Sequence, residues 1–234
     1  MSALQALLFD CDGVLVDTER DGHRVAFNQA FRQLGIETEW SIERYGELLE
    51  VAGGKERMRH HFAEVGWPQV DDRDAFILEA HKLKTRLFMD LVLSGTMDIR
   101  PGVLNLIAEA LGDGVKVAVC STSNVRAVQG IVDHLIGGDL APQIPVFAGD
   151  IVKAKKPDPA IYHLAVDELG LDPARALVIE DSNIGLRAAK AAGLNCVVTK
   201  SSYTEDEDFA PADLVVNDLG SGGVNLARCR ALIA

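Results

Sequence analysis

The feature that most constrains the fold is an alternation of two patterns along the second half of the chain. From residue 100 onward, short runs of apolar, mostly β-branched residues alternate with segments whose apolar residues recur at helical spacing. This alternation predicts an α/β fold with a doubly wound, mainly parallel sheet and helices on both of its faces. The predicted strands are 115–120, 146–148, 176–179, 195–199 and 214–216. The predicted helices are 103–111, 125–135, 160–169 and 184–192.

The segment between residues 18 and 97 has a different character. Strand-like runs disappear there, and charged segments with helical spacing replace them, at 22–34, 55–65 and 74–92. We therefore predict an α/β core of residues 1–17 and 98–234 and an inserted α-helical cap of residues 18–97. A cap inserted beside a site can close over it and exclude water, and the alternative is a packing subdomain without such motion.

A further apolar run at residues 6–9 precedes Asp10-Cys11-Asp12-Gly13. We predict that this run is the first strand of the sheet, so that two carboxylates stand at its carboxyl end, where ligand sites form. Two like charges this close repel each other, and a divalent cation relieves the repulsion. Oxygen ligands favour Mg²⁺, which often binds carboxylates together with a substrate phosphate. The alternative from these residues alone is a polar turn, because Asp and Gly are ordinary turn residues.

Composition narrows the classes of protein. The formal net charge of −12 argues against a nucleic-acid partner, because the binding of nucleic acid relies on Lys and Arg. With this net charge, an anionic substrate needs a local group of positive side chains. No apolar stretch reaches the ~18 residues of a membrane span, and we expect no secretory signal because the first predicted strand begins just after Met1. The cysteines form no C-x-x-C pair, which indicates reduced thiols; they are Cys11, Cys120, Cys196 and Cys229.

Three polar motifs follow predicted strands. Ser121-Thr122-Ser123-Asn124 precedes a predicted helix and could bind an anion, with ordinary helix capping as the alternative. The basic segment 153–157 contains Lys156 before a proline, and taken alone it could be a solvated turn. Glu180-Asp181 adds carboxylates, although acidic helix N-termini are common. Because the carboxyl ends of parallel strands meet at one edge of a sheet, we expect all these groups to converge.

The order of these motifs resembles that of the haloacid dehalogenase superfamily of phosphotransferases, and the likeness spans nearly the whole chain, including the inserted cap. The resemblance implies that Asp10 is the nucleophile, which forms an aspartyl-phosphate, and that Asp12 is the general acid and base. It implies that Ser121 anchors the phosphoryl group. It also implies that Lys156 balances the charge on Asp10 and on the transferring group.

The same resemblance implies a Mg²⁺ cofactor. Its ligands would be the carboxylate of Asp10, the backbone carbonyl of Asp12 and the carboxylate of Asp181, with Glu180 as a direct or water-mediated ligand. Thr122 would donate its amide to the phosphoryl group, and Ser123 and Asn124 would complete that binding segment. Cys11 departs from the small or branched residues of other family members, and we expect it to be a packed thiol.

Substrate choice is expected to lie in the cap. The segment 53–57 places two cations at the start of a predicted helix, where a phosphate distal to the cleaved one could bind; the alternative is a glycine loop with solvent-facing charges. Further segments resemble the Cbby-type proteins that accompany Rubisco in photosynthetic bacteria and plastids, which are xylulose-1,5-bisphosphate phosphatases. Those segments are 17–19, 45–49, 53–58, 81–85, 119–124 and 155–162.

This closer resemblance implies hydrolysis of the C1 phosphate of xylulose 1,5-bisphosphate to xylulose 5-phosphate, which removes an inhibitor of Rubisco in the Calvin cycle. The residues that hold the sugar and its distal phosphate would then be Glu19, Tyr45, Gly53, Gly54, Lys55, Arg57, His81 and Lys84. We expect a monomer that acts on a small phosphorylated sugar, without a nucleic-acid, membrane or obligate protein partner. The expected compartment is the chloroplast stroma for a mature chain, or else the bacterial cytoplasm.

Other functions stay open at this point. A β-phosphoglucomutase-like phosphomutase would share the core and a second phosphate site, but it would return the phosphoryl group to the sugar instead of to water. A receiver-like phosphoacceptor of signalling also binds Mg²⁺ at a phosphorylated Asp, yet it needs neither a general acid such as Asp12 nor a large cap. A dehalogenase acting on a haloacid fits less well, since it needs neither Mg²⁺ nor the second aspartate.

Overall fold

The computed structural model describes residues 4–51 and 53–233, which form two compact units. The core unit runs to Asp17 and resumes at Gly95, and the cap unit is Thr18–Ser94. The cap unit ends before the expected residue 97 because its last helix, α4 (Arg73–Ser94), stops at Ser94. Among the described residues, no helix is both long enough and apolar enough to cross a membrane.

Within the described chain, the core sheet has six parallel strands in the order β3-β2-β1-β4-β5-β6. β1 (Ala6–Phe9) lies at the centre and pairs with β2 (Lys116–Ser121) and β4 (Ala176–Glu180). The outer strands are β3 (Val146–Ala148), β5 (Asn195–Thr199) and β6 (Leu214–Val216). The predicted doubly wound α/β fold is confirmed. Its strand order reverses beside β1, and ligands bind at such a switch point, outside the carboxyl ends of the strands.

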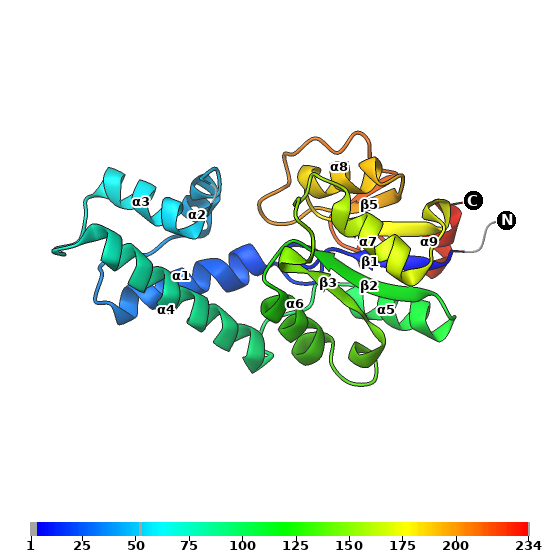
Figure 1. The fold of residues 1–234 in the computed structure, drawn as a ribbon, viewed down its shortest axis with the longest axis horizontal. Coiled ribbons are helices and arrows are strands. Elements are labelled where there is room, and N and C mark those ends of the chain that lie inside the picture. Colours follow the sequence, from blue (N-terminus) through cyan, green and yellow to red (C-terminus); the bar gives the residue numbers. More distant parts are fainter. Residues whose placement is uncertain (1–3, 52, 234) are drawn as a thin grey trace. The chain divides into compact units, whose positions relative to one another are not determined.

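Helices cover both faces of this sheet (Figure 1). One face packs against α7 (Ala160–Leu169) and α8 (Asn183–Ala191), and the other packs against α5 (Val103–Gly112), which contacts α9 (Leu226–Ala231). The side chains of a strand point alternately to the two faces of its sheet, so all four residues of β1 are buried. This burial fixes the position at which the chain leaves β1.

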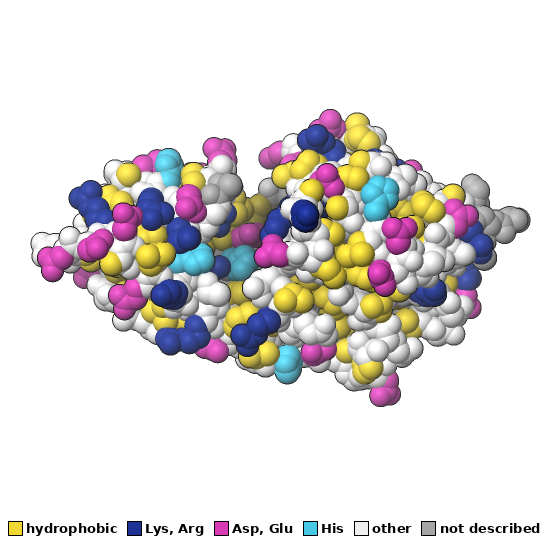
Figure 2. Space-filling view, in the orientation of Figure 1, with side chains coloured by type: hydrophobic (Ala, Val, Ile, Leu, Met, Phe, Trp, Pro, Cys, Tyr) yellow, Lys and Arg dark blue, Asp and Glu magenta, His cyan; other side chains and the backbone are white. Residues whose placement is uncertain are grey.

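The cap unit consists of helices and one π-helical turn. The turn, η1 (Thr18–His23), leads into α1 (Arg24–Gln33), and α2 (Ile42–Leu48), α3 (Gly54–Val65) and α4 follow. These elements enclose buried aromatic rings; the centroids of Phe31 and Trp40, for example, lie 4.9 Å apart in a T-shaped arrangement. Figure 2 shows that basic, acidic and histidine side chains are interspersed over the surface of the cap.

The structure differs from the predicted elements mainly in short segments. Periodicity does not predict α2 or α9, because seven and six residues contain too few apolar positions to define a period. The helix predicted at 125–135 is α6 (Val125–Ile131) followed by a π-helical turn, Val132–Ile136. Three short 3₁₀ turns within the described residues were not predicted: Ala141–Gln143, Gly149–Ile151 and Pro173–Arg175. β2 and β4 each extend beyond the predicted end, to Ser121 and Glu180.

Candidate active site

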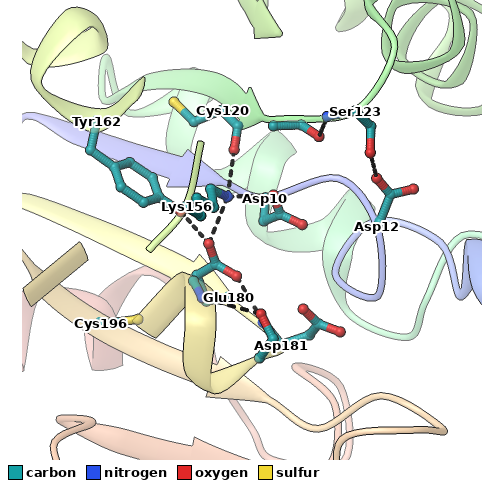
Figure 3. A network of polar contacts seen from close by, with 12 residues as sticks. Asp10, Asp12, Cys120, Ser123, Lys156, Tyr162, Glu180, Asp181 and Cys196 are labelled. Atoms are coloured by element: carbon teal, nitrogen blue, oxygen red, sulfur yellow. Dashed lines mark hydrogen bonds and ion pairs between the residues drawn. The ribbon is translucent and has the colours of Figure 1, made fainter. Parts of the chain in front are cut away.

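Three neighbouring strands bring predicted catalytic and metal-binding residues to one edge of the sheet (Figure 3). Asp10 directly follows β1, Ser121 is the last residue of β2, and Glu180 is the last residue of β4. The amide of Asp10 donates to the carbonyl of Ile179 at 2.9 Å, which continues the pairing of β1 and β4 up to the site. The sheet therefore places these side chains at its switch point.

Lys156 is the cation in this part of the core. Its Nζ lies 2.5 Å from Oδ1 of Asp10 and 2.7 Å from Oε1 of Glu180, and it donates to the carbonyl of Cys120 at 2.9 Å. These contacts use the three N–H groups of an ammonium. The side chain of Lys156 is only 7% exposed, whereas the other two lysines of this segment are exposed. Lys156 is thus the lysine of the segment that can balance charge on Asp10.

Asp10, Glu180 and Asp181 form a buried acidic cluster in which one carboxylate oxygen of each lies within 4.8 Å of the others. Burial raises the pKa of Asp10, and although the charge of Lys156 opposes this, the neighbouring carboxylates help to bring it to about 7. Burial and the charges of Asp10 and Glu180 likewise raise the pKa of Asp181 well above its usual range. Lys156 contacts two of the three carboxylates, so the cluster as a whole lacks positive charge. A divalent cation that prefers oxygen ligands fits this donor set.

The loop after β1 fits closely against the acidic cluster. Gly13 has a φ of 77°, and a Cβ there would lie 1.9 Å from Oδ2 of Asp181, so only glycine leaves room for this carboxylate. The guanidinium of Arg100 donates to the carbonyl of Gly13. It also donates to backbone carbonyls at and after the ends of β5 and β6, those of Thr199, Lys200 and Asn217. Arg100 thus fixes the loop that carries Asp12.

The carboxylate of Asp12 lies beside Ser123, whose hydroxyl donates to its Oδ2 (Figure 3). Among the described residues, the Asp12 carboxylate stands outside the three-residue acidic cluster. The Asp12 carboxylate is thus hydrogen-bonded to the segment after β2 and stands apart from the acidic cluster. Cys11, between the two aspartates, is buried, and burial together with their charges raises the pKa of its thiol well above the usual range.

The segment after β2 has mixed roles. The hydroxyl of Ser121 accepts from the amide of Ser123 at 3.1 Å, which folds the segment into a tight turn. Thr122 lies half-buried in this turn, and its carbonyl accepts from Lys155 at 3.2 Å. Asn124 caps α6, because its side-chain oxygen accepts from the amide of Arg126 at 3.0 Å. The capping alternative therefore describes the Asn124 oxygen, while Ser123 contacts the carboxylate of Asp12.

In the cap, Glu19, Tyr45 and Arg57 form a hydrogen-bonded chain. The Tyr45 hydroxyl donates to Oε2 of Glu19 at 2.6 Å, and Nη1 of Arg57 donates to the Tyr45 hydroxyl at 2.8 Å. Arg57 is only 8% exposed, and its Nε donates to the carbonyl of Leu48 at 3.0 Å. Arg57 is therefore a buried and oriented cation, and the alternative of solvent-facing charges is wrong for this residue.

A second group of basic side chains lies in the same unit. Lys84 is 8% exposed, and its Nζ lies 2.9 Å from Nδ1 of His23 and 4.7 Å from the ring centroid of Phe27. Burial lowers the pKa of His23 well below its usual range, and the charges of Lys84, Arg57 and His81 lower it further. A neutral His23 can accept a hydrogen bond from the Lys84 ammonium and so orient it.

His81 and Lys55 belong to this basic group as well. Burial lowers the pKa of His81, and the charges of Lys84 and Lys55 lower it further. A Cβ at Gly54 would lie 3.1 Å from the ring of His81, so the small residue lets α3 approach α4 closely. Gly53, at the start of α3, is exposed with a φ of 92°. All the cap residues predicted to bind substrate thus belong to these two adjoining groups, where positive charge predominates.

The sequence does not reveal several residues that contact the predicted site residues or the loop that carries them. Tyr162 donates its hydroxyl to Glu180, His23 contacts Lys84, and Arg100 holds the loop after Asp12. Each partner lies at least 18 residues away in the chain, so no local spacing identifies the pair. The one available signal is for Tyr162, which stands in the Lys-Pro segment 155–162.

Three comparisons place this site among known proteins. The family model for haloacid dehalogenase-like hydrolases matches residues 4–193. A CBBY-like protein of Arabidopsis thaliana is 53% identical to this chain, and the match covers 97% of this chain and 74% of the relative. Protein CbbY of Cereibacter sphaeroides is 41% identical, and the match covers 94% of each chain. A crystal structure of a CbbY mutant from Rhodobacter sphaeroides in complex with xylulose-(1,5)bisphosphate is 38% identical with a TM-score of 0.76, over 95% of this chain and 99% of that chain. The matches cover the strands that carry the site as well as the inserted cap, and the chain therefore belongs to the haloacid dehalogenase-like hydrolase family.

Proposed function

We propose that this protein is a Mg²⁺-dependent phosphatase that hydrolyses the C1 phosphate of xylulose 1,5-bisphosphate to give xylulose 5-phosphate. The observation that carries the proposal is the 2.5 Å contact between Lys156 and Asp10 within a buried cluster of three carboxylates. A carboxylate held by a lysine beside a cation-binding cluster suits attack on phosphorus, because positive charge stabilises the transferring group. The relative CbbY, solved in complex with xylulose-(1,5)bisphosphate, supports the choice of sugar.

In this proposal Asp10 is the nucleophile. One of its oxygens bonds to phosphorus while the bond between phosphorus and the C1 oxygen breaks, which leaves an aspartyl-phosphate. Asp12 gives a proton to the departing C1 oxygen and later takes one from the water that hydrolyses the aspartyl-phosphate. Ser121 and the amide of Thr122 hold the phosphoryl oxygens. The products are phosphate and xylulose 5-phosphate.

The residues that would hold Mg²⁺ are Asp10, Asp181 and, through its backbone carbonyl, Asp12. When bound, the cation neutralises charge on the phosphoryl oxygens. Glu180 is less available as a direct ligand, because its Oε1 already accepts from Lys156 and from the Tyr162 hydroxyl. We therefore assign Glu180 to the orientation of Lys156.

The cap selects the substrate in this proposal. The phosphate that is not cleaved is bound by the basic residues Lys55, Arg57, His81 and Lys84, and Gly53 and Gly54 shape the start of α3. The sugar hydroxyls contact Glu19 and Tyr45. The reacting phosphate is bordered by Ser123 and Asn124. A sugar with two phosphates meets both requirements, since one reacts beside Asp10 and the other needs a basic group.

A substrate panel tests the proposal directly. Xylulose 1,5-bisphosphate, β-glucose 1-phosphate and a 2-haloacid are each incubated with the protein, with Mg²⁺ and with excess EDTA. We expect phosphate release from the xylulose bisphosphate with Mg²⁺ and its loss with EDTA. Isomerisation of β-glucose 1-phosphate without phosphate release would replace the phosphatase by a phosphomutase, and halide release with EDTA would replace it by a dehalogenase.

We further propose that the reaction removes an inhibitor of Rubisco, and that the mature chain acts in the chloroplast stroma as a monomer. The plant relative supports this compartment, and the bacterial relative supports the alternative of a bacterial cytoplasm. Adding the protein to Rubisco inhibited by xylulose 1,5-bisphosphate is expected to restore carboxylation, whereas heat-inactivated protein is not. Persistent inhibition with the active protein would contradict this role.

A further inference from the structure

One buried hydroxyl touches the catalytic network without a part in the reaction described above. Tyr162, on α7, is fully buried, and its hydroxyl donates to Oε1 of Glu180. The Nζ of Lys156 lies 4.9 Å from the centroid of the Tyr162 ring. Figure 3 shows Tyr162 and Asp10 on opposite sides of Lys156, with Glu180 contacting both Lys156 and Tyr162.

We propose that Tyr162 is a positioning residue, which acts through Glu180 to keep the Lys156 ammonium on Asp10. This inference rests on the proposed phosphatase function, because it concerns the lysine of that reaction. Tyr162 touches neither Asp10 nor the position of the substrate in this proposal. The Tyr162 hydroxyl donates a second hydrogen bond to Glu180, so that the Lys156 ammonium keeps its contacts with both Glu180 and Asp10 in a fixed geometry.

Lys156 has no spare donor. Its three N–H groups already meet Asp10, Glu180 and the carbonyl of Cys120. If the Tyr162 hydroxyl were removed, Lys156 could make up the loss at Glu180 only by moving toward it. Such a shift lengthens the 2.5 Å contact with Asp10.

Among the described residues, the donors to Oε1 of Glu180 are Lys156 and the Tyr162 hydroxyl, and nothing else nearby can replace the hydroxyl. Glu180 is 1% exposed, so bulk water does not reach its carboxylate. Within the described part of the chain, its other oxygen, Oε2, accepts a single long contact of 3.3 Å from the Asp181 amide. A Cβ at Gly185 would lie 2.0 Å from the Glu180 carboxylate, so α8 walls off the remaining side. A buried carboxylate that loses one donor is left short of hydrogen bonds, and this is unfavourable.

The ring of Tyr162 contributes separately from its hydroxyl. The aromatic face lies near the ammonium of Lys156, which is favourable for a cation, and it fills space in the core between α7 and the sheet. Tyr162→Phe keeps the ring and its packing and removes one oxygen. The variant therefore isolates the hydrogen bond to Glu180.

The test compares Tyr162→Phe with the wild type in steady-state phosphate release from xylulose 1,5-bisphosphate. We expect kcat to fall about tenfold, which corresponds to about 1.4 kcal/mol of activation free energy, while KM changes less than about twofold because the cap residues are unaffected. Thermal unfolding is measured on the same samples and is expected to differ by only a few degrees. Thr38→Val, which removes the hydroxyl that contacts Nε2 of His61 in the cap at 3.2 Å, is the matched control and should keep kcat.

The outcomes separate this inference from the function on which it rests. A wild-type protein without phosphatase activity would overturn the proposed function. An active wild type whose Tyr162→Phe variant keeps kcat within twofold would overturn the role of Tyr162 alone. A raised KM with unchanged kcat, or an equal loss of kcat in Thr38→Val, would also overturn it, because neither result follows from a displaced Lys156.

Discussion

The two polar regions of this molecule have opposite imbalances of charge. In the core, a cluster of three buried carboxylates has one lysine beside it, which contacts two of them, whereas in the cap the basic side chains of Arg57, Lys84 and their neighbours outnumber the acidic ones beside them. An unbalanced buried charge is unfavourable, so the core favours a cation and the cap favours an anion. Under the proposed function, this difference assigns reaction and recognition to separate parts of the chain, with the chemistry at the strand ends and the choice of substrate in the insertion.

The largest effect is expected where the core loses its nucleophile. Asp10→Asn keeps the shape of the side chain but removes its nucleophilic oxygen, so kcat for phosphate release should fall by at least about 10⁴-fold. Asp150→Asn is the matched control, because Asp150 is 94% exposed and lies outside the acidic cluster. A kcat for Asp10→Asn within tenfold of the wild type would contradict the role of Asp10.

A smaller loss, and a different intermediate state, is expected for the proton-transferring residue. Asp12→Asn should lower kcat by about 10³-fold, because general acid–base catalysis is lost, yet Asp10 should still be phosphorylated slowly. Acid-quenched reactions with ³²P-labelled substrate measure the aspartyl-phosphate that accumulates. If Asp12→Asn retained full turnover, the core would behave as a simple phosphoacceptor, as in a receiver module.

The role of the basic side chains of the cap is tested by measuring KM. Lys84→Met removes one buried cation from the basic group, so KM for xylulose 1,5-bisphosphate should rise about tenfold with little change in kcat. The value of kcat/KM for p-nitrophenyl phosphate, which has no second phosphate, should stay unchanged. Lys82→Met, on an exposed position of the same helix, is the control. An equal loss with both substrates would mean that Lys84 does not recognise the distal phosphate.

The smallest effect concerns the stability of the cap. The pKa of His23 is lowered in the folded chain by burial and by the charges of Lys84, Arg57 and His81. The unfolded chain, with an imidazole pKa near 6.5, therefore binds the proton more tightly, so stability rises with pH up to about 6.5 and is lost below it. One such proton contributes a slope of at most about 1.4 kcal/mol per pH unit.

Urea unfolding followed at several values between pH 7.5 and pH 5 measures this slope. His23→Asn should reduce the slope of the unfolding free energy with pH. A part of the slope should remain, because burial also lowers the pKa values of His61 and His81. His163→Asn, which changes an exposed ring on α7, should leave the slope unchanged. The same slope in His23→Asn and in the wild type would mean that His23 does not contribute.

The sheet can be predicted from the sequence more completely than the rest of the fold. β3, β5 and β6 have the predicted bounds. In β5 the apolar residues of the run are buried, as in a strand covered on both faces, whereas β6, at the edge of the sheet, is only partly buried. α2 and α9 are stabilised by caps at Ser41 and Asn225 and by packing, and these features give no periodic signal in so few residues. The π-helical turn after α6 depends on tertiary packing in the same way.

For the site, strand-end residues such as Asp10 and Glu180 can be predicted because the chain order fixes which strand ends they occupy. The contacts between them cannot be predicted in this way. That Lys156 contacts Asp10 across 146 positions follows only from the folded sheet, and so does the bond of Tyr162 to Glu180. Sequence patterns predict which groups meet at the edge of the sheet, whereas tertiary packing decides which of their atoms form hydrogen bonds.

The hydrogen bonds of Arg100 also have a consequence for how the protein is made. This guanidinium joins the loop at Gly13 to the carbonyl of Asn217, near the end of the last strand. Every catalytic and metal-binding residue assigned above lies between residues 10 and 181, so a ribosome completes all of them before Asn217 emerges. A nascent chain at that stage carries the full set of reacting groups and still lacks one of the backbone acceptors that hold Arg100, so the full anchoring of the loop of Asp12 is expected only once synthesis has passed β6.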